Sequence, residues 1–188
     1  MKFSVTQNGV PLDSSKYDWD ESTKIFSTEE DNLVLDFKNI DGIVFKTGRD
    51  CTFDTGAYCT FNAYSNCTFD TGFYCTFNTS YGCTFNTRSN CIFKTSDNCT
   101  FNTGYNCTFN TDYGCTFKTT SDCKFTIGDK STIRTYYNSR ITMKESCVIH
   151  REDTNEVWMF SNCMIQTNEK NEPGYLDEDE LICKDIIE

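Results

Sequence analysis

The central part of this chain alternates hydrophobic and polar positions within a strict period of eight residues. In phase with Cys51, octads run from residue 43 to residue 146, and phenylalanine fills the third position eleven times in succession. Cysteine opens ten successive octads, from Cys51 to Cys123. Within an octad, Cys, Phe and a second Thr alternate with a first Thr and a polar residue. This alternation is typical of a strand with one buried face.

The remaining three residues of each octad are drawn mostly from Gly, Ser, Asp, Asn and Tyr, most of which favour tight turns of the chain. One such unit cannot bury its phenylalanine alone, whereas stacked units form a continuous core. The sequence therefore predicts an all-β, single-chain β-solenoid over residues 35–150. We expect a small β cap module over residues 1–34, with a hairpin turn at Gln7-Asn8-Gly9. We also expect a C-terminal cap with an acidic tail over residues 151–188, in which an acidic run over residues 177–180 precedes a partly apolar tail over residues 181–187.

The number of octads in one coil is predicted from the first corner residue. This residue is large in every third octad, at Tyr64, Arg88, Asp112 and Tyr136, and is Gly, Ser or Thr in the octads between. A two-sided coil of sixteen residues would also stack Asp54 on Asp70. We therefore predict a three-sided coil of about 24 residues, eight per side, which gives about four coils and a rod roughly 20 Å long.

An alternative arrangement weaves three chains into one triangular prism, as phage spikes do. In such a prism each octad would stack on an octad of another chain, and a rhythm of about 24 residues would have no purpose. The period therefore favours the coil made from one chain.

Composition and charge narrow the classes of function. The net charge of −11 is divided into −5 over residues 1–42, +2 over residues 43–146 and −8 over residues 147–188. The octad array has no basic stripe that would neutralise phosphates, so nucleic acid is not an expected partner. The chain has no apolar stretch long enough to span a membrane, and Met1-Lys2-Phe3-Ser4 does not open a secretory signal. Neither a membrane nor export by the usual route is expected.

The thirteen cysteines follow the repeat, and their number is odd, which argues against a secreted disulfide scaffold. Cysteine pairs at the spacing of metal sites are missing, and His150 is the only histidine. We expect free, buried thiols that act as small hydrophobic side chains, and we expect neither a metal site nor a cofactor.

Catalytic candidates are few, and each has a simpler interpretation. His150 follows the core position Ile149 and has no nucleophile or orienting partner in the sequence, so we expect a surface histidine. Paired carboxylates could cleave glycosides, but the three-sided coil places Asp54 and Asp70 on different sides. The sequence therefore predicts no catalytic residue and no enzyme.

Two kinds of surface binding remain as alternatives. Ice binding needs two outward threonine columns on one face, whereas the two threonines of an octad lie three apart and point to opposite faces. Carbohydrate could stack on exposed corner tyrosines. These tyrosines are Tyr58, Tyr74, Tyr81, Tyr105 and Tyr113.

The phrase Cys-Thr-Phe-Asn-Thr-Gly-Tyr-Asn at residues 99–106 resembles the octad-repeat proteins of large tailed phages and some gut bacteria. The opening Asn8-Gly9-Val10-Pro11-Leu12 is similar to a small strand module that begins many phage tail-fibre and virion proteins. Val148-Ile149-His150-Arg151 with Glu156-Val157 is similar to the closing segment of the same group. The resemblance covers most of the chain.

This resemblance implies a non-enzymatic structural or adaptor protein of a phage particle, associated with the tail or the virion and made in the cytoplasm of a bacterial host. Other virion or tail proteins are the expected partners, and a homo-oligomer is left open. A carbohydrate- or receptor-binding module that uses the corner tyrosines is the alternative function, and a β-helical lyase or hydrolase is a third hypothesis.

Overall fold

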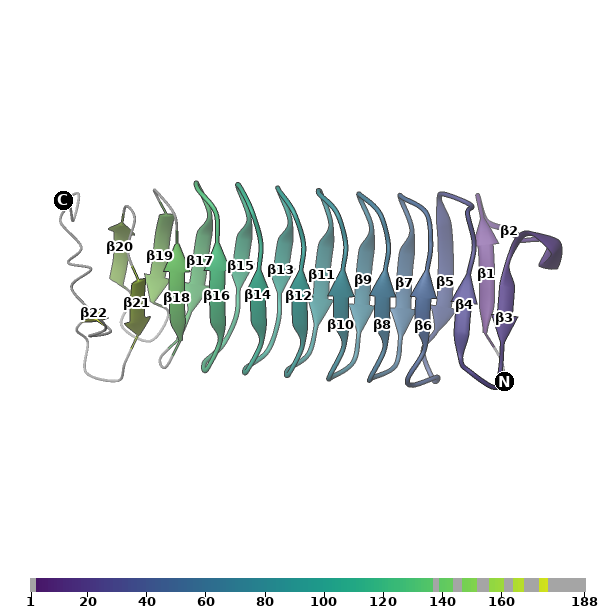
Figure 1. The fold of residues 1–188 in the computed structure, drawn as a ribbon, viewed down its shortest axis with the longest axis horizontal. Coiled ribbons are helices and arrows are strands. Elements are labelled where there is room, and N and C mark those ends of the chain that lie inside the picture. Colours follow the sequence, from purple (N-terminus) through teal and green to yellow (C-terminus); the bar gives the residue numbers. More distant parts are fainter. Residues whose placement is uncertain are drawn as a thin grey trace.

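The computed structural model describes residues 3–136, 139–143, 147–151, 156–160, 164–167 and 173–175. They form a rod made of two eleven-stranded sheets (Figure 1). Sheet A contains, in spatial order, β2 (Val10–Pro11), β1 (Ser4–Gln7), β5 (Leu33–Phe37), β7 (Thr52–Thr55), β9 (Thr68–Thr71), β11 (Thr84–Thr87), β13 (Thr100–Asn102), β15 (Thr116–Lys118), β17 (Thr132–Thr135), β19 (Cys147–Arg151) and β20 (Glu156–Phe160).

Sheet B is formed by the strands that alternate with these along the chain. It contains, in spatial order, β3 (Asp18–Asp20), β4 (Ile25–Ser27), β6 (Val44–Lys46), β8 (Thr60–Asn62), β10 (Thr76–Asn78), β12 (Ile92–Lys94), β14 (Thr108–Asn110), β16 (Lys124–Ile127), β18 (Arg140–Met143), β21 (Met164–Thr167) and β22 (Pro173–Tyr175). Among the described residues, the only helical element is the short 3-10 turn η1 (Ser14–Lys16), and none of their helices could cross a membrane.

The chain crosses from one sheet to the other after every octad and returns to the first sheet sixteen residues later. Phe69 of β9 therefore lies beside Phe85 of β11, and Phe77 of β10 lies beside Phe93 of β12, in parallel register. Every one of these partners belongs to the same chain. The predicted all-β, single-chain β-solenoid is confirmed, and the woven prism is not the arrangement of this chain.

The predicted three-sided coil of about 24 residues is wrong, because the coil has two sides and sixteen residues. The prediction rested on the size of the first corner side chain, on the assumption that only one of three corners accepts a large residue. Both edges of the two-sided coil accept one, because the side chain can point to solvent; Tyr64 is 65% exposed. The rod is also longer than predicted. The thirteen octads supply seven strands of sheet B, from β6 to β18, which span about 29 Å at about 4.8 Å per strand, and all eleven strands of the sheet span about 48 Å.

The stacking of Asp54 on Asp70, which counted against a two-sided coil, does occur between β7 and β9. The position faces outward, and Lys38 Nζ lies 2.8 Å from Asp54 Oδ2. Exposure to water and this neighbouring cation reduce the repulsion between the two carboxylates.

The core is a regular lattice of phenylalanine rings between the two sheets. Within sheet A, Phe85 stacks on Phe101 with ring centroids 4.8 Å apart and an interplanar angle of 4°. Across the sheets, Phe85 meets Phe93 of sheet B edge to face, at 5.2 Å and 74°. Both geometries are favourable for aromatic quadrupoles. The thin two-sided coil thus fills its interior with one ring per strand.

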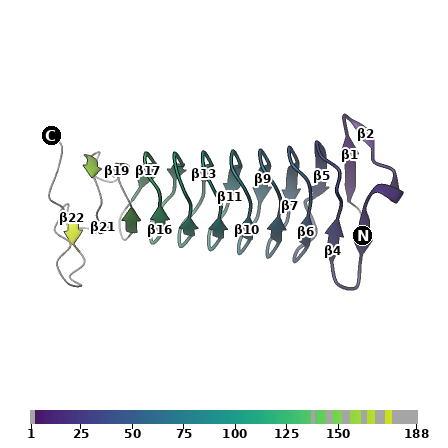
Figure 2. The ribbon, with the colours of Figure 1, turned by 45° about the horizontal axis from the view of Figure 1, so that its top comes forward.

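The N-terminal end of the rod is covered by antiparallel strands, as Figure 2 shows. β1 pairs with β5 in antiparallel register, and the hairpin to β2 turns at Asn8 and Gly9, which have φ values of 53° and 78°. The predicted hairpin turn at Gln7-Asn8-Gly9 is confirmed. Phe3 stacks on the buried Phe37 at 4.4 Å, so this module closes the core.

At the other end, β20 pairs with β19 and β21 pairs with β18, both in antiparallel register. The parallel stacking therefore ends in antiparallel strands on both sheets. The predicted acidic run over residues 177–180 and the partly apolar tail over residues 181–187 lie outside the described residues.

Candidate binding surfaces

Each sheet presents two columns of side chains to solvent, one from the second and one from the fourth position of the octads. On sheet A the second-position column runs from Val34 through six threonines to Val148. The second threonine of each octad points inward; Thr52 is exposed and Thr55 is buried. Sheet A therefore carries one outward threonine column, and the second-position column of sheet B holds threonine only at Thr60, Thr76 and Thr108. Neither sheet has the two complete outward threonine columns that ice binding needs.

The fourth-position column of sheet A changes charge along the rod. Its described members, in order, are Asp36, Asp54, Asp70, Asn86, Asn102, Lys118 and Arg134. We call the three aspartates the acidic end, and Lys118 with Arg134 the basic end. The corresponding column of sheet B is Ser27, Lys46, Asn62, Asn78, Lys94, Asn110, Thr126 and Thr142.

The acidic end brings together carboxylates that the sequence analysis placed on different sides. Asp36, Asp54 and Asp70 occupy three adjacent strands of sheet A, so the prediction that Asp54 and Asp70 lie apart is wrong. The pKa of Lys38 is raised, first by its hydrogen bond to Asp54 and then by the charges of Asp54, Asp36 and Asp70. A neighbouring cation stabilises ionised carboxylates, whereas a general acid needs a carboxyl that keeps its proton.

Asparagine side chains form ladders on the same columns. Asn102 Nδ2 donates to Asn86 Oδ1 at 3.2 Å on sheet A, and Asn78 Nδ2 donates to Asn62 Oδ1 at 3.4 Å on sheet B. Parallel in-register stacking places identical amides one strand apart, so each can donate to the next. These bonds join adjacent coils on the outside of the rod.

The corner tyrosines are divided between the two edges of the rod. Tyr58, Tyr74 and Tyr105 lie at the edge where the chain leaves sheet A, and their exposed fractions are 60%, 52% and 52%. The rings of Tyr58 and Tyr74 are parallel, with an interplanar angle of 3° and centroids 5.1 Å apart. Arg88 lies over the ring of Phe73 at the same edge, 5.3 Å from its centroid. We call these residues the aromatic edge.

The backbone at the aromatic edge is unusual for its side chains. Up to Lys130, the last residue of every octad lies in the left-handed region and is Asn, Asp or Gly at most corners, whereas Tyr58 and Tyr74 both have φ of 59°. Left-handed backbone is costly for bulky residues and is accepted more readily by Asn and Gly. The two rings are therefore held outward and parallel by a conformation that most corners give to smaller residues.

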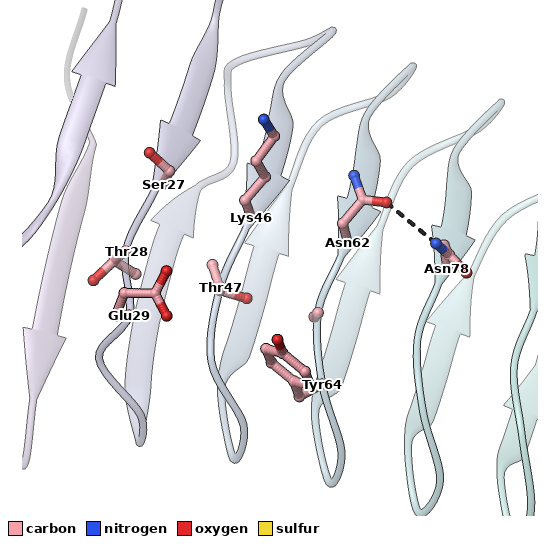
Figure 3. Close-up of a pocket in the computed structure, with 9 residues that line it drawn as sticks. Ser27, Thr28, Glu29, Lys46, Thr47, Asn62, Tyr64 and Asn78 are labelled. Atoms are coloured by element: carbon pink, nitrogen blue, oxygen red, sulfur yellow. Dashed lines mark hydrogen bonds between the residues drawn. The ribbon is translucent and has the colours of Figure 1, made fainter.

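The opposite edge carries the two remaining predicted tyrosines and a shallow hollow. Tyr81 and Tyr113 are exposed there, and Lys130 Nζ lies 5.4 Å from the centroid of the Tyr113 ring. The hollow, of about 390 Å³, lies where Ala63 replaces the threonine found in the adjacent coils (Figure 3). It is lined by Ser27, Thr28, Glu29, Lys46, Thr47, Asn62, Ala63, Tyr64 and Asn78.

The cysteines lie inside the rod and not on these surfaces. The eleven described cysteines, Cys51 to Cys123 and Cys147, are free and buried, as the sequence predicts. Their thiols donate to corner carbonyls; Cys83 Sγ lies 3.5 Å from the Tyr64 oxygen and 3.7 Å from the Tyr81 oxygen. Burial raises the pKa of Cys147. These groups thus fill space and satisfy buried carbonyls.

The remaining candidates add no further site within the described residues. His150 lies on β19 beside Arg134 of β17, and its side chain is outside the described part of the structure. No group of three His, Cys, Asp or Glu side chains that could hold a metal ion occurs among the residues that were searched. A comparison with protein families, curated proteins and solved structures finds no match to this chain.

The sequence analysis missed the charge gradient of sheet A. Its signal is present in the sequence, because reading every second octad from Asp54 gives two aspartates, two asparagines and then Lys118 and Arg134. The coil of about 24 residues distributed these positions over three sides and so hid the pattern.

Proposed function

We propose that this chain is a non-enzymatic structural or adaptor rod of a phage particle. The uninterrupted phenylalanine lattice supports this role best. Each ring from Phe45 to Phe125 stacks on a ring of an adjacent coil and meets at least one ring of the opposite sheet, so no flexible joint interrupts this part of the core. Close packing of this kind resists bending and transmits load along the rod.

The assignment to a phage particle rests on the resemblance of the octad and of both flanking segments to phage-associated repeat proteins. At the N-terminal end of the rod, antiparallel strands cover the edges of both sheets, where strands of another chain could otherwise pair. A rod closed in this way is consistent with a component of defined length. The outward-facing setting of Asp54, paired with Lys38 of the same chain, supports a structural role for the acidic end.

The test of this proposal is the protein content of purified phage particles. Particles from lysates of cells that carry the gene should contain the chain in constant stoichiometry through a density gradient, and its deletion should remove or shorten a visible tail or virion feature. Recovery of the chain only from the soluble fraction of the host, with particles unchanged by its deletion, would reject the proposal.

A second candidate function, carbohydrate or receptor binding, is favoured by the aromatic edge. Two parallel exposed rings offer flat apolar surfaces of the kind on which sugar rings stack. Tyr58 and Tyr74 occupy left-handed corner positions that most octads give to Asn, Asp or Gly, so the turn itself does not require a tyrosine there.

A glycan array tests this candidate directly. Binding should fall by at least about tenfold in a Tyr58→Ala, Tyr74→Ala double variant, since each ring would contribute stacking energy. A Tyr81→Ala, Tyr113→Ala variant, altered at the opposite edge, is the matched control and should bind as the parent does. An array without signal would dismiss carbohydrate binding and leave the structural role in place.

A further inference from the structure

The outer face of sheet A has a symmetry that neither the repeat nor the core requires. Eight parallel strands, from β5 to β19, form this face, and its midpoint lies between β11 and β13. The second-position column is the same when read from either end, with Val34 and Val148 at the ends and threonines between. The fourth-position column reverses its charge about the same midpoint at two pairs of positions, Asp70 with Lys118 and Asp54 with Arg134, while Asp36 at one end corresponds to His150 at the other.

We propose that this face is the contact surface of an antiparallel homodimer. A twofold axis parallel to the strands, between β11 and β13, reverses the direction of the rod and keeps the direction of the strands. Each column of one copy then faces the same column of its partner in reverse order. The contact is isologous, so every pair of residues in it occurs twice.

This operation places opposite charges face to face at two positions in each half of the contact. Asp70 on β9 lies opposite Lys118 on β15 of the second copy, and Asp54 on β7 lies opposite Arg134 on β17. The three ion pairs between described residues of one chain do not include Asp70 or Lys118, and both side chains are exposed. Lys38, which pairs with Asp54 within its own chain, lies at the end of the contact.

The middle and the ends of the face also match. Asn86 and Asn102 lie on either side of the midpoint, so Asn86 of one copy faces Asn102 of the other. Their amide groups can donate and accept hydrogen bonds across the contact. Val34 is 49% exposed and meets Val148 of the second copy, so each end of the second-position column buries an apolar pair. A parallel arrangement of the two rods would instead bring both acidic ends together.

The size of the face fits a reversible contact. Eight strands about 4.8 Å apart, each contributing about four residues of 3.3 Å, give about 500 Å² per copy. The total of about 1,000 Å² lies at the lower limit for specific protein interfaces. Much of the specificity comes from charge pairs exposed at the surface, so the dimer should weaken as salt screens them.

A comparison with sheet B indicates that the charge complementarity between two copies is specific to sheet A. On its parallel strands, β4 to β18, the charged residues in the outward columns are all basic, namely Lys46, Lys94, Lys124 and Arg140, and the acidic Asp18 and Asp20 lie beyond them on the antiparallel strand β3. Two copies of sheet B placed face to face would repel each other, whereas two copies of sheet A attract in one orientation only. Because sheet A attracts a second copy and sheet B repels one, two rods pair through sheet A, and further rods do not add to them as a stack.

The experiment measures the mass of the full chain by sedimentation equilibrium at low and high salt. At low salt we expect twice the 21.6 kDa mass of the chain, with dissociation to the monomer as salt is raised. The charge reversal Asp70→Lys should weaken the affinity between the two copies by at least about tenfold. Two cations then face each other at this position, and the twofold symmetry makes the repulsion occur twice. The double variant Asp70→Lys, Lys118→Asp should restore it.

Two control variants separate this contact from a general effect of charge. Lys94→Asp makes the same change as Lys118→Asp at the fourth position of sheet B, and Asp112→Lys makes the same change as Asp70→Lys at a corner. Both should dimerise as the parent does, and circular dichroism verifies that every variant is folded. A monomer at low salt, masses that grow beyond the dimer, or equal weakening by Lys94→Asp and Lys118→Asp would each overturn the proposal. The structural role of the rod would stand in all three cases.

Discussion

At the scale of single residues, the octad uses each side chain for one physical task. The phenylalanine fills the space between the sheets, and the cysteine is small enough to lie beneath a corner while its thiol donates to corner carbonyls. The last residue adopts the left-handed backbone that turns the corner. These tasks are local, and for this reason the sequence could predict the inward direction of Phe, Cys and the second Thr.

The inward-facing second threonine of the octad destabilises the folded state at several positions, which the sequence could not reveal. The hydroxyls of Thr47, Thr71, Thr79, Thr95 and Thr111 are buried without a hydrogen-bond partner among the described residues. A buried polar group without a partner destabilises the folded state.

Replacing such a threonine by valine should therefore stabilise the protein. Thr95→Val keeps the shape and removes the lone hydroxyl, so the free energy of unfolding should rise by about 1 kcal/mol. Thr119→Val is the matched control, because Thr119 Oγ1 lies 3.1 Å from Thr135 Oγ1 and its loss breaks a bond. Urea unfolding measures both, and stabilisation by Thr119→Val, or destabilisation by Thr95→Val, would contradict this explanation.

At the scale of the strand, stability comes from burial on one face only. Phe85→Ala should lower the free energy of unfolding by about 3–5 kcal/mol, since the ring is fully buried among stacked and edge-to-face partners. Thr84→Ala, one residue away on the outward face, should change it by less than about 0.5 kcal/mol. Comparable losses from the two variants in thermal or urea unfolding would show that the ring does not have the inward position described.

The pairing of strands gives a direct test of the sixteen-residue coil. Asn62 and Asn78 lie on adjacent strands of sheet B, whereas Asn86 lies on sheet A. In a double-mutant cycle, Asn62→Asp with Asn78→Lys should show a favourable coupling of about 0.2–1 kcal/mol.

The control cycle pairs Asn62→Asp with Asn86→Lys, which a coil of about 24 residues would bring together. We expect no coupling between these two positions, because they face away from each other on opposite sides of the rod. Coupling in this second cycle and its absence in the first would restore the three-sided coil.

At the scale of the whole molecule, the two-sided coil makes a longer and thinner rod than the three-sided one. Eleven strands in each sheet predict a long dimension of about 48 Å, of which the thirteen octads account for about 29 Å, against about 20 Å for the same octads in four three-sided coils. Small-angle X-ray scattering at high salt, where the proposed dimer is dissociated, measures this dimension. A compact particle of nearly equal dimensions would contradict the architecture.

The sequence by itself determined the octad, the β-strands and the buried face. These features follow from local alternation and from turn residues, because every octad must bury its phenylalanine and reverse direction. The hairpin at Asn8 and Gly9 belongs to the same class, since both residues accept positive φ.

Only the tertiary structure decided how many octads form a coil. Nearly identical octads satisfy the same local rules whether two or three of them complete a turn, and the choice depends on how their rings pack across the interior. Two sheets allow Phe85 and Phe93 to meet edge to face without an empty centre. That packing placed Asp54 beside Asp70 and collected the opposite charges of sheet A on one face, which no inspection of single octads could establish.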